Sequence, residues 1–222
     1  MTDDAGPSVG LLSWCGAALV VAGVLIVVAT LLHPSVETPA TIIASEVGLV
    51  AAHVAYTVAW LLVLLGLPGL YASVRRETGR LGLVGFVGAF AGSYLLAVSG
   101  NFGFLAPVLA KESPAVIDVI SQYLPVVGLN GLAAVGFMVG YILFGIAITK
   151  TTTMPRLSGV MMAVGAPAHL LGFGLAQFVS PAIWLIAISG SVSLGAGLAW
   201  AGHRLWRTPA TSDQPPDKDT RA

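Results

Sequence analysis

The stretch that decides the fold covers residues 157–203 and reads LSGVMMAVGAPAHLLGFGLAQFVSPAIWLIAISGSVSLGAGLAWAGH. Its 47 residues include no Asp, Glu, Lys or Arg. A helix needs about 20 apolar residues to cross the hydrocarbon core of a bilayer, so this stretch is long enough to cross twice. Ser180-Pro181 interrupts it, and such a pair is typical of a chain that leaves one helix and enters the next. We therefore expect two membrane-spanning helices joined by a tight turn.

The other charge-free stretches are residues 5–36, 47–74, 81–110 and 119–149. Leu, Ala and Gly dominate them, and they lack the alternation of polar and apolar residues found in membrane β-strands. We predict an all-α fold, a polytopic transmembrane helix bundle over residues 1–207, followed by a disordered cytoplasmic tail over 208–222. The six predicted spans are about 11–32, 47–72, 81–105, 126–149, 157–179 and 182–203. A short helix at the outer membrane interface is predicted over 113–124, where Ser-Pro begins the segment.

The overall composition excludes several classes of protein. Hydrophobic residues make up 56% of the chain and charged residues 9%, and the mean hydropathy is +0.90. Ten cations balance ten anions, so the chain lacks the positive charge of a nucleic-acid-binding protein. The lone cysteine, Cys15, excludes an intrachain disulfide and a CxxC site, and we expect it to be a packed thiol.

The positions of the cations predict the orientation. Only Lys111 falls on one side of the six-helix arrangement. The other nine cations fall on the opposite side, and they are Arg75, Arg76, Arg80, Lys150, Arg156, Arg204, Arg207, Lys218 and Arg221. Because positive loops stay in the cytoplasm, both termini are predicted to be cytoplasmic in a cell (plasma) membrane. Trp14, Trp200 and Trp206 are expected to mark the inner interface, and Trp184 the outer one.

Several short motifs carry a resemblance. They are the span end Leu32-His33-Pro34, the string Gly66-Leu67-Pro68-Gly69-Leu70-Tyr71, the Arg75-Arg76 loop and the glycine-rich third span. With these features, the first half of the chain resembles uncharacterised prokaryotic multi-pass membrane proteins of about six helices. The resemblance implies a helical membrane fold and brings no functional residues with it.

Polar residues within the spans gather in the half of the bundle predicted to face outward. Because an unsatisfied polar group in hydrocarbon costs several kcal/mol, a hydrated pocket open to the outside would accommodate these side chains. Interhelical hydrogen bonds would satisfy them equally well, and that alternative stays open. The candidate ligand-binding residues are Glu46 at the mouth, His53, Asn101, Asn130 and Gln177 in the walls, and His169 at the floor.

The function expected from this pocket is binding or passing a small apolar or amphipathic ligand. Enzymatic chemistry is not favoured, because the chain has no HExxH, GxSxG or Walker-type sequence. A haem held by His53 and His169 is one alternative, because they are the only two imidazoles expected inside the hydrocarbon. A zinc site formed by Glu46, His53 and His33 is another, although His33 itself is expected to be a solvated loop or rim residue.

Glycines spaced four residues apart support a further alternative. They occur at Gly88 and Gly92 in the third span and at Gly136 and Gly140 in the fourth. Such spacing lets helices approach closely. We expect packing within the chain, while a homodimer, or an accessory or scaffold subunit docked to another membrane protein, stays open. The predicted partners are therefore the lipid bilayer, a small-molecule ligand and a membrane protein, but no nucleic acid.

Overall fold

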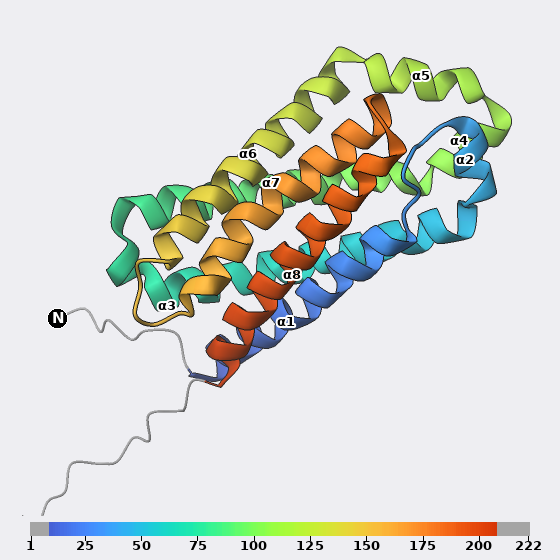
Figure 1. Cartoon of the computed structure of the whole chain (residues 1–222). Helices are drawn as coiled ribbons and strands as arrows, with labels where there is room; N and C mark the ends of the chain where they lie inside the picture. The colour runs from blue at the N-terminus through green and yellow to red at the C-terminus, as the bar shows by residue number, and fades with distance from the viewer. Residues whose placement is uncertain (1–8, 208–222) are drawn as a thin grey trace, which may run out of the picture.

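A computed structural model describes residues 9–207, and within that range the chain forms helices and no strands (Figure 1). Five segments are long and apolar enough to cross a membrane, in agreement with an all-α bundle of apolar helices. Their helices are α1 (Val9–Leu32), α3 (Glu46–Gly100), α6 (Leu124–Ile148), α7 (Arg156–Phe178) and α8 (Trp184–Trp206). The short elements are α2 (Pro39–Ala44), η1 (Asn101–Phe104), α4 (Ala106–Glu112), α5 (Pro114–Gln122) and η2 (Pro181–Ile183).

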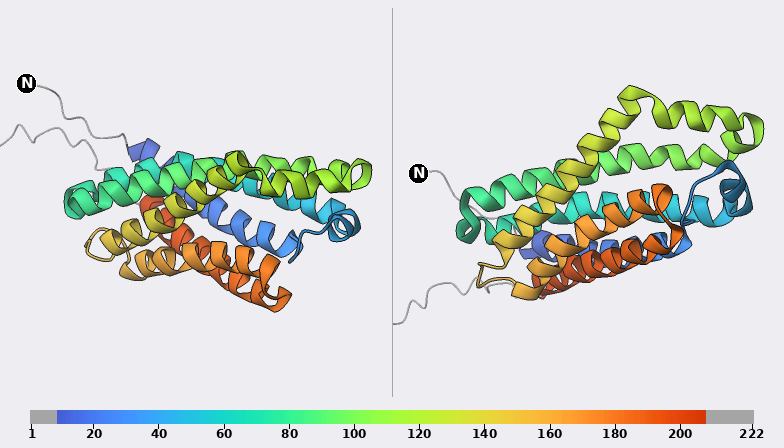
Figure 2. Two further views of the ribbon diagram at one scale, coloured as in Figure 1. Left: turned by 90° about the horizontal axis from the view of Figure 1, so that it is seen from above. Right: turned by 45° about the horizontal axis from the view of Figure 1, so that its top comes forward.

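Helix α3 reverses its direction at Gly79. This glycine has φ 55° and ψ −146°, a backbone conformation that a side chain disfavours. The chain doubles back there, so that two helical legs, 46–78 and 80–100, lie side by side (Figures 1 and 2). The rings of Tyr71 and Phe86 stack across the two legs with centroids 4.6 Å apart. The reversal falls at the predicted boundary between the second and third spans, and the first leg continues six residues beyond its expected end at 72.

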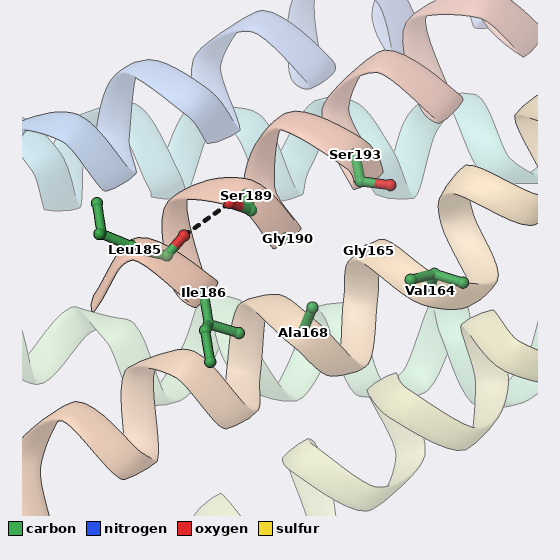
Figure 3. A pocket seen from close by; sticks show the side chains of 8 residues that line it. All are labelled: Val164, Gly165, Ala168, Leu185, Ile186, Ser189, Gly190 and Ser193. Carbon is green, nitrogen blue, oxygen red and sulfur yellow. Dashed lines mark hydrogen bonds between the residues drawn. The ribbon is translucent and has the colours of Figure 1, made fainter. Parts of the chain in front are cut away.

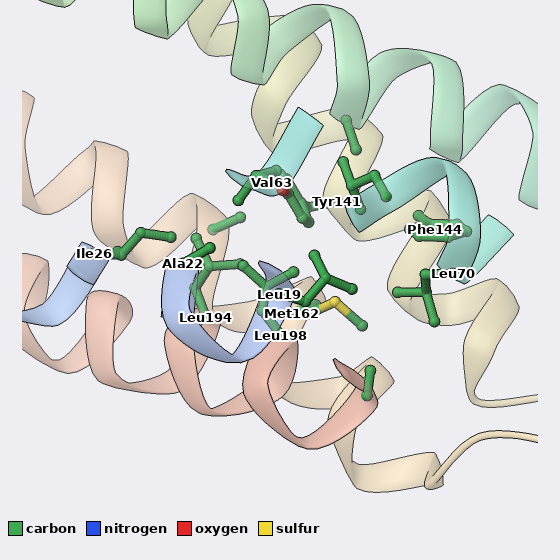
Figure 4. Close-up of a cluster of buried hydrophobic side chains, with 14 of the residues drawn as sticks. Leu19, Ala22, Ile26, Val63, Leu70, Tyr141, Phe144, Met162, Leu194 and Leu198 are labelled. Carbon is green, nitrogen blue, oxygen red and sulfur yellow. The ribbon is translucent and has the colours of Figure 1, made fainter. Parts of the chain in front are cut away.

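The long helices pack around one apolar core. Helix α1 lies between α3 and α8, α7 packs on α8, and α6 packs on α3 and α7. Figure 4 shows the centre of this core, where side chains from all five long helices meet. Its fully buried members include Leu19, Ile26, Leu70, Tyr141, Phe144, Met162 and Leu194.

Glycines let the helices of this core touch backbone to backbone. A Cβ placed on Gly140 would lie 2.0 Å from the Ala89 nitrogen, and one on Gly92 would lie 2.2 Å from the Phe137 nitrogen. Helices α1 and α8 meet in the same way at Gly23 and Gly195. These small-residue faces therefore serve packing within the chain, as expected from their spacing.

The connections gather at the two ends of the bundle. At one end, the Glu77 carboxylate accepts hydrogen bonds from the Thr152 backbone at 2.7 Å, from its hydroxyl at 2.9 Å and from the Thr153 hydroxyl. Those hydrogen bonds lower the pKa of Glu77. At the other end, Glu46 accepts from Lys111 Nζ at 2.7 Å, which ties α4 to the start of α3.

The tryptophans correct one part of the interface prediction. Trp14, Trp200 and Trp206 are exposed as expected, whereas Trp184 is 9% exposed and lies inside the bundle. The short helix predicted over 113–124 is present as α5. The tail over 208–222, predicted to be disordered, lies outside the described residues.

We predict that Gly140→Ala destabilises the bundle by about 1–3 kcal/mol, because the added methyl would collide with the α3 backbone. The matched control is Gly131→Ala in the same helix, where a Cβ meets nothing within 4 Å. Unfolding in mixed detergent micelles measures both. Equal stability of the two variants would show that the contact between α3 and α6 is looser than described.

Candidate functional site

The candidate site begins where α1 ends, at His33. Pro34 follows this residue and restricts it to non-helical backbone, so the chain turns away from the helix here. The imidazole is only 5% exposed. Its Nδ1 lies 2.9 Å from the Pro34 carbonyl oxygen, and its Nε2 lies 3.2 Å from Glu37 Oε1. A carbonyl and a carboxylate both accept hydrogen bonds, so the His33 ring lies within donating distance of two acceptors.

Glu37 completes this pair from the loop between α1 and α2. Its side chain is 40% exposed. Burial raises the pKa of Glu37, but the hydrogen bond with His33 and the electrostatic interactions with His33 and His53 lower it by more. The net result is a pKa below the usual value, so the carboxylate is ionised at neutral pH. The loop therefore holds an acid against an imidazole at the edge of an apolar bundle.

Aromatic rings surround His33 on the inner side. Its ring stacks on Trp184 with centroids 5.8 Å apart and an interplanar angle of 28°. Phe173 meets it edge to face at 5.2 Å, and also contacts Trp184 at 4.4 Å. These side chains come from α7 and α8, so the His33–Glu37 pair lies directly against an aromatic wall.

His53 of α3 lies on the other side of His33, with ring centroids 5.3 Å apart. The His53 ring is half-buried and reaches toward η1, where Phe104 lies 6.0 Å away. A Cβ at Gly103 would lie 2.0 Å from His53 Nε2, so the absence of a side chain at 103 makes room for the imidazole. Two imidazoles from different helices therefore lie next to one carboxylate.

A buried hydrogen-bonded network lies deeper in the bundle. His169 Nδ1 lies 2.6 Å from the Ser191 hydroxyl, which lies 2.7 Å from the Thr30 hydroxyl. Thr30 in turn lies 2.7 Å from the Tyr56 hydroxyl. Each member comes from a different long helix, and all four are buried. The network thus joins α1, α3, α7 and α8 at one level.

Counting protons assigns the tautomer of His169. Besides the three contacts between side chains, Thr30 and Ser191 each reach a carbonyl one turn back in their own helices, at 2.9 and 2.7 Å. These five contacts share three hydroxyl protons and whatever His169 Nδ1 supplies. Four contacts are satisfied if Nδ1 carries its proton and at most three if it does not. We therefore assign a proton to Nδ1, so that His169 donates to Ser191.

Ring contacts connect the two layers into one group, which we call the outer cluster. Tyr56 lies 6.4 Å from His33 and 6.1 Å from His169, and Phe173 lies 4.9 Å from His169. The outer cluster consists of Thr30, His33, Glu37, His53, Tyr56, His169, Phe173, Trp184 and Ser191.

The structure brings together three of the six residues predicted to bind a ligand. His53 and His169 belong to the outer cluster, and Gln177 reaches its rim because its side-chain oxygen accepts from the Glu37 backbone at 2.9 Å. Glu46 instead pairs with Lys111. Asn101 and Asn130 are exposed, and their side-chain amides make no hydrogen bond to the described residues. These two amides therefore do not form the pocket walls that the sequence predicted.

Sequence reasoning missed the centre of the cluster. His33 was expected at the surface because it follows a span, and Trp184 was expected at the interface because tryptophans collect there. The sequence does hold one signal, since His33 and Glu37 are four residues apart beside Pro34. The hydroxyls of Thr30 and Ser191 gave no signal, because each resembles any small residue within an apolar helix.

Other side chains lie between the two imidazoles considered for haem. Tyr56, His33 and Phe173 fill the space between His53 and His169, which a macrocycle would need. Among the described residues, no group of three or more His, Cys, Asp or Glu side chains could hold a metal ion.

A separate shallow groove lies on the outer surface of α7 and α8 (Figure 3). Apart from two serines its lining is apolar, and Ser189 already donates to the Leu185 carbonyl at 2.8 Å. The second serine, Ser193, donates to the Met161 carbonyl at 3.0 Å. With its hydroxyls already hydrogen-bonded, this groove offers a surface suited to lipid chains and adds nothing to the outer cluster.

Comparisons with family models, with curated proteins and with solved structures find no match to this chain.

We predict that Ser191→Ala lowers the free energy of unfolding by about 1–2 kcal/mol, because it leaves His169 and Thr30 without their shared partner in a buried position. Ser189→Ala removes an exposed hydroxyl from the same helix and should change stability by less than about 0.5 kcal/mol. Both are measured by unfolding in mixed micelles. A loss at Ser189 that matches the loss at Ser191 would contradict the network.

Proposed function

We propose that this chain is a multi-pass protein of the plasma membrane that crosses the bilayer six times, with both termini in the cytoplasm. The reversal at Gly79 supports six crossings, because each leg of α3 is long enough to cross separately, at about 1.5 Å per residue. Hydrogen bonds that Thr152 donates to the Glu77 carboxylate support a common side for the two cationic loops. Positive charge on that side favours the cytoplasm.

Cysteine labelling tests this orientation. In a Cys15→Ala background, we expect Ser113→Cys to react with a membrane-impermeant maleimide in intact cells. Thr153→Cys should react only after the cells are permeabilised, because it lies on the cationic side. Both positions are exposed, and neither change alters charge. Labelling of Thr153→Cys in intact cells would contradict the topology.

We further propose that the protein binds a small amphipathic molecule at the outer cluster. The observation that carries this proposal is the grouping of Glu37, His33 and His53 at one end of a bundle that is otherwise poor in charge. Ionisable groups within or beside membrane helices are expensive to keep and commonly mark sites of function.

The chemistry of the cluster suits a molecule with a polar head and an apolar body. The half-buried His53 and the partly exposed Glu37 can donate to and accept from a polar group. Phe173 and Trp184 provide an apolar surface immediately behind them. Tyr56 and Phe173 lie between His169 and the edge of the cluster. A ligand is therefore expected to contact Glu37 and His53 at that edge, while His169 stabilises the side chains behind them.

Analysis of copurified molecules tests this proposal. We expect a solvent extract of purified wild-type protein to contain a small molecule other than the bulk lipids, identified by liquid chromatography and mass spectrometry. His53→Ala should reduce its molar ratio tenfold or more, because it removes a polar contact of the site. His203→Ala, an exposed histidine at the opposite end, is the matched control and should retain it. The absence of any such molecule, or equal amounts in both variants, would contradict ligand binding at this cluster.

A scaffold role is the second candidate, and one observation favours it. Asn130 is exposed in the outer half of α6, and the neighbouring Gly128 and Gly131 have open space around them. An amide flanked by glycines on an apolar helix is suited to dock another membrane helix or a second copy of this chain. Native mass spectrometry of the same preparation separates the two functions, because a docked protein adds a much larger mass than a small molecule.

A further inference from the structure

The reversal of α3 carries a second site, far from the outer cluster. A shallow depression between the two legs is lined by Tyr71, Arg75, Arg76, Gly79, Arg80 and Leu83. We propose that it binds the phosphate of an anionic lipid headgroup. The two legs both contribute, since Arg75 and Arg76 precede Gly79 and Arg80 follows it. All three arginines line the depression at the reversal around Gly79.

The arginines are available for a ligand because the nearest acid is occupied elsewhere. Glu77 is the only carboxylate in the segment 73–80, and its oxygens accept from Thr152 and Thr153. Among residues 9–207, no hydrogen bond or ion pair joins the guanidinium group of Arg75, Arg76 or Arg80 to another residue, and all three residues are exposed. One guanidinium group can donate two parallel hydrogen bonds to two oxygens of a phosphate, which suits arginine to this ligand.

The surroundings favour a lipid over free phosphate. Leu83, Val84 and Val87 follow the arginines along the second leg and are 46%, 58% and 53% exposed. Acyl chains lying along this apolar stripe would leave the headgroup phosphate level with the arginines. Basic groups at the end of membrane helices attract anionic lipids in this way. Tyr71, fixed by its stack on Phe86, forms the wall between headgroup and bundle.

The test is native mass spectrometry of the full chain in detergent with an equimolar mixture of phosphatidylglycerol and phosphatidylcholine. We expect wild-type protein to retain phosphatidylglycerol preferentially. The variant Arg75→Gln/Arg76→Gln/Arg80→Gln should bind it at least tenfold more weakly. The control Lys150→Gln/Arg156→Gln/Arg207→Gln removes the same charge from the same end and should retain the preference. An equal loss in both variants would overturn the site in favour of general electrostatic attraction.

Two further measurements test the guanidinium groups and the identity of the ligand separately. Arg75→Lys/Arg76→Lys/Arg80→Lys keeps the charges that orient insertion, and should bind phosphatidylglycerol several-fold more weakly because lysine lacks the bidentate fork. Unchanged affinity in that variant would overturn recognition by the guanidinium groups. A large excess of sodium phosphate should leave the bound lipid in place, and displacement by it would reassign the depression to a soluble phosphate.

Discussion

The direct contact between helix backbones is the constraint on which this structure depends. Lipid chains are as apolar as leucine, so burying leucine between helices gains little inside a membrane, and close van der Waals packing has to hold the bundle together. Gly140 against Ala89 and Gly23 against Gly195 provide that packing in two separate helix pairs. These contacts fix how far apart the helices lie, and hence which polar side chains can reach one another across them.

The outer cluster follows from that spacing. In α1, Gly23 precedes Thr30 by about two turns, and in α8 Gly195 follows Ser191 by about one turn. With the two helices this close, the short hydroxyls meet at 2.7 Å, and His169 and Tyr56 complete the network from α7 and α3. A glycine contact and a hydrogen-bonded network are thus parts of one arrangement. The network in turn supports the rings against which His33 and Glu37 lie.

The helices could be predicted from the sequence because hydrocarbon thickness dictates their length, and charges are excluded from them. The predicted bounds of α6, α7 and α8 agree with the structure within three residues. Three of the six candidate residues also gather as expected in one region. The rest depends on rotation about each helix axis, which composition does not reveal. Asn130 and His169 look equivalent in sequence, yet Asn130 is exposed whereas His169 is buried in a network with three other helices. His33 was misjudged because a loop residue can turn back into the bundle.

The positive φ of Gly79 has a consequence for how the chain is threaded into the bilayer. A Cβ at this position would meet no neighbouring atom, so the backbone angle alone restricts the residue. If the bundle crosses the membrane six times as proposed, this one angle sets the direction in which every later helix crosses the bilayer. An uninterrupted helix in its place would turn an even number of crossings into an odd one, and α6, α7 and α8 would each enter from the opposite face. In that topology, a single backbone torsion determines from which side of the membrane each later segment enters.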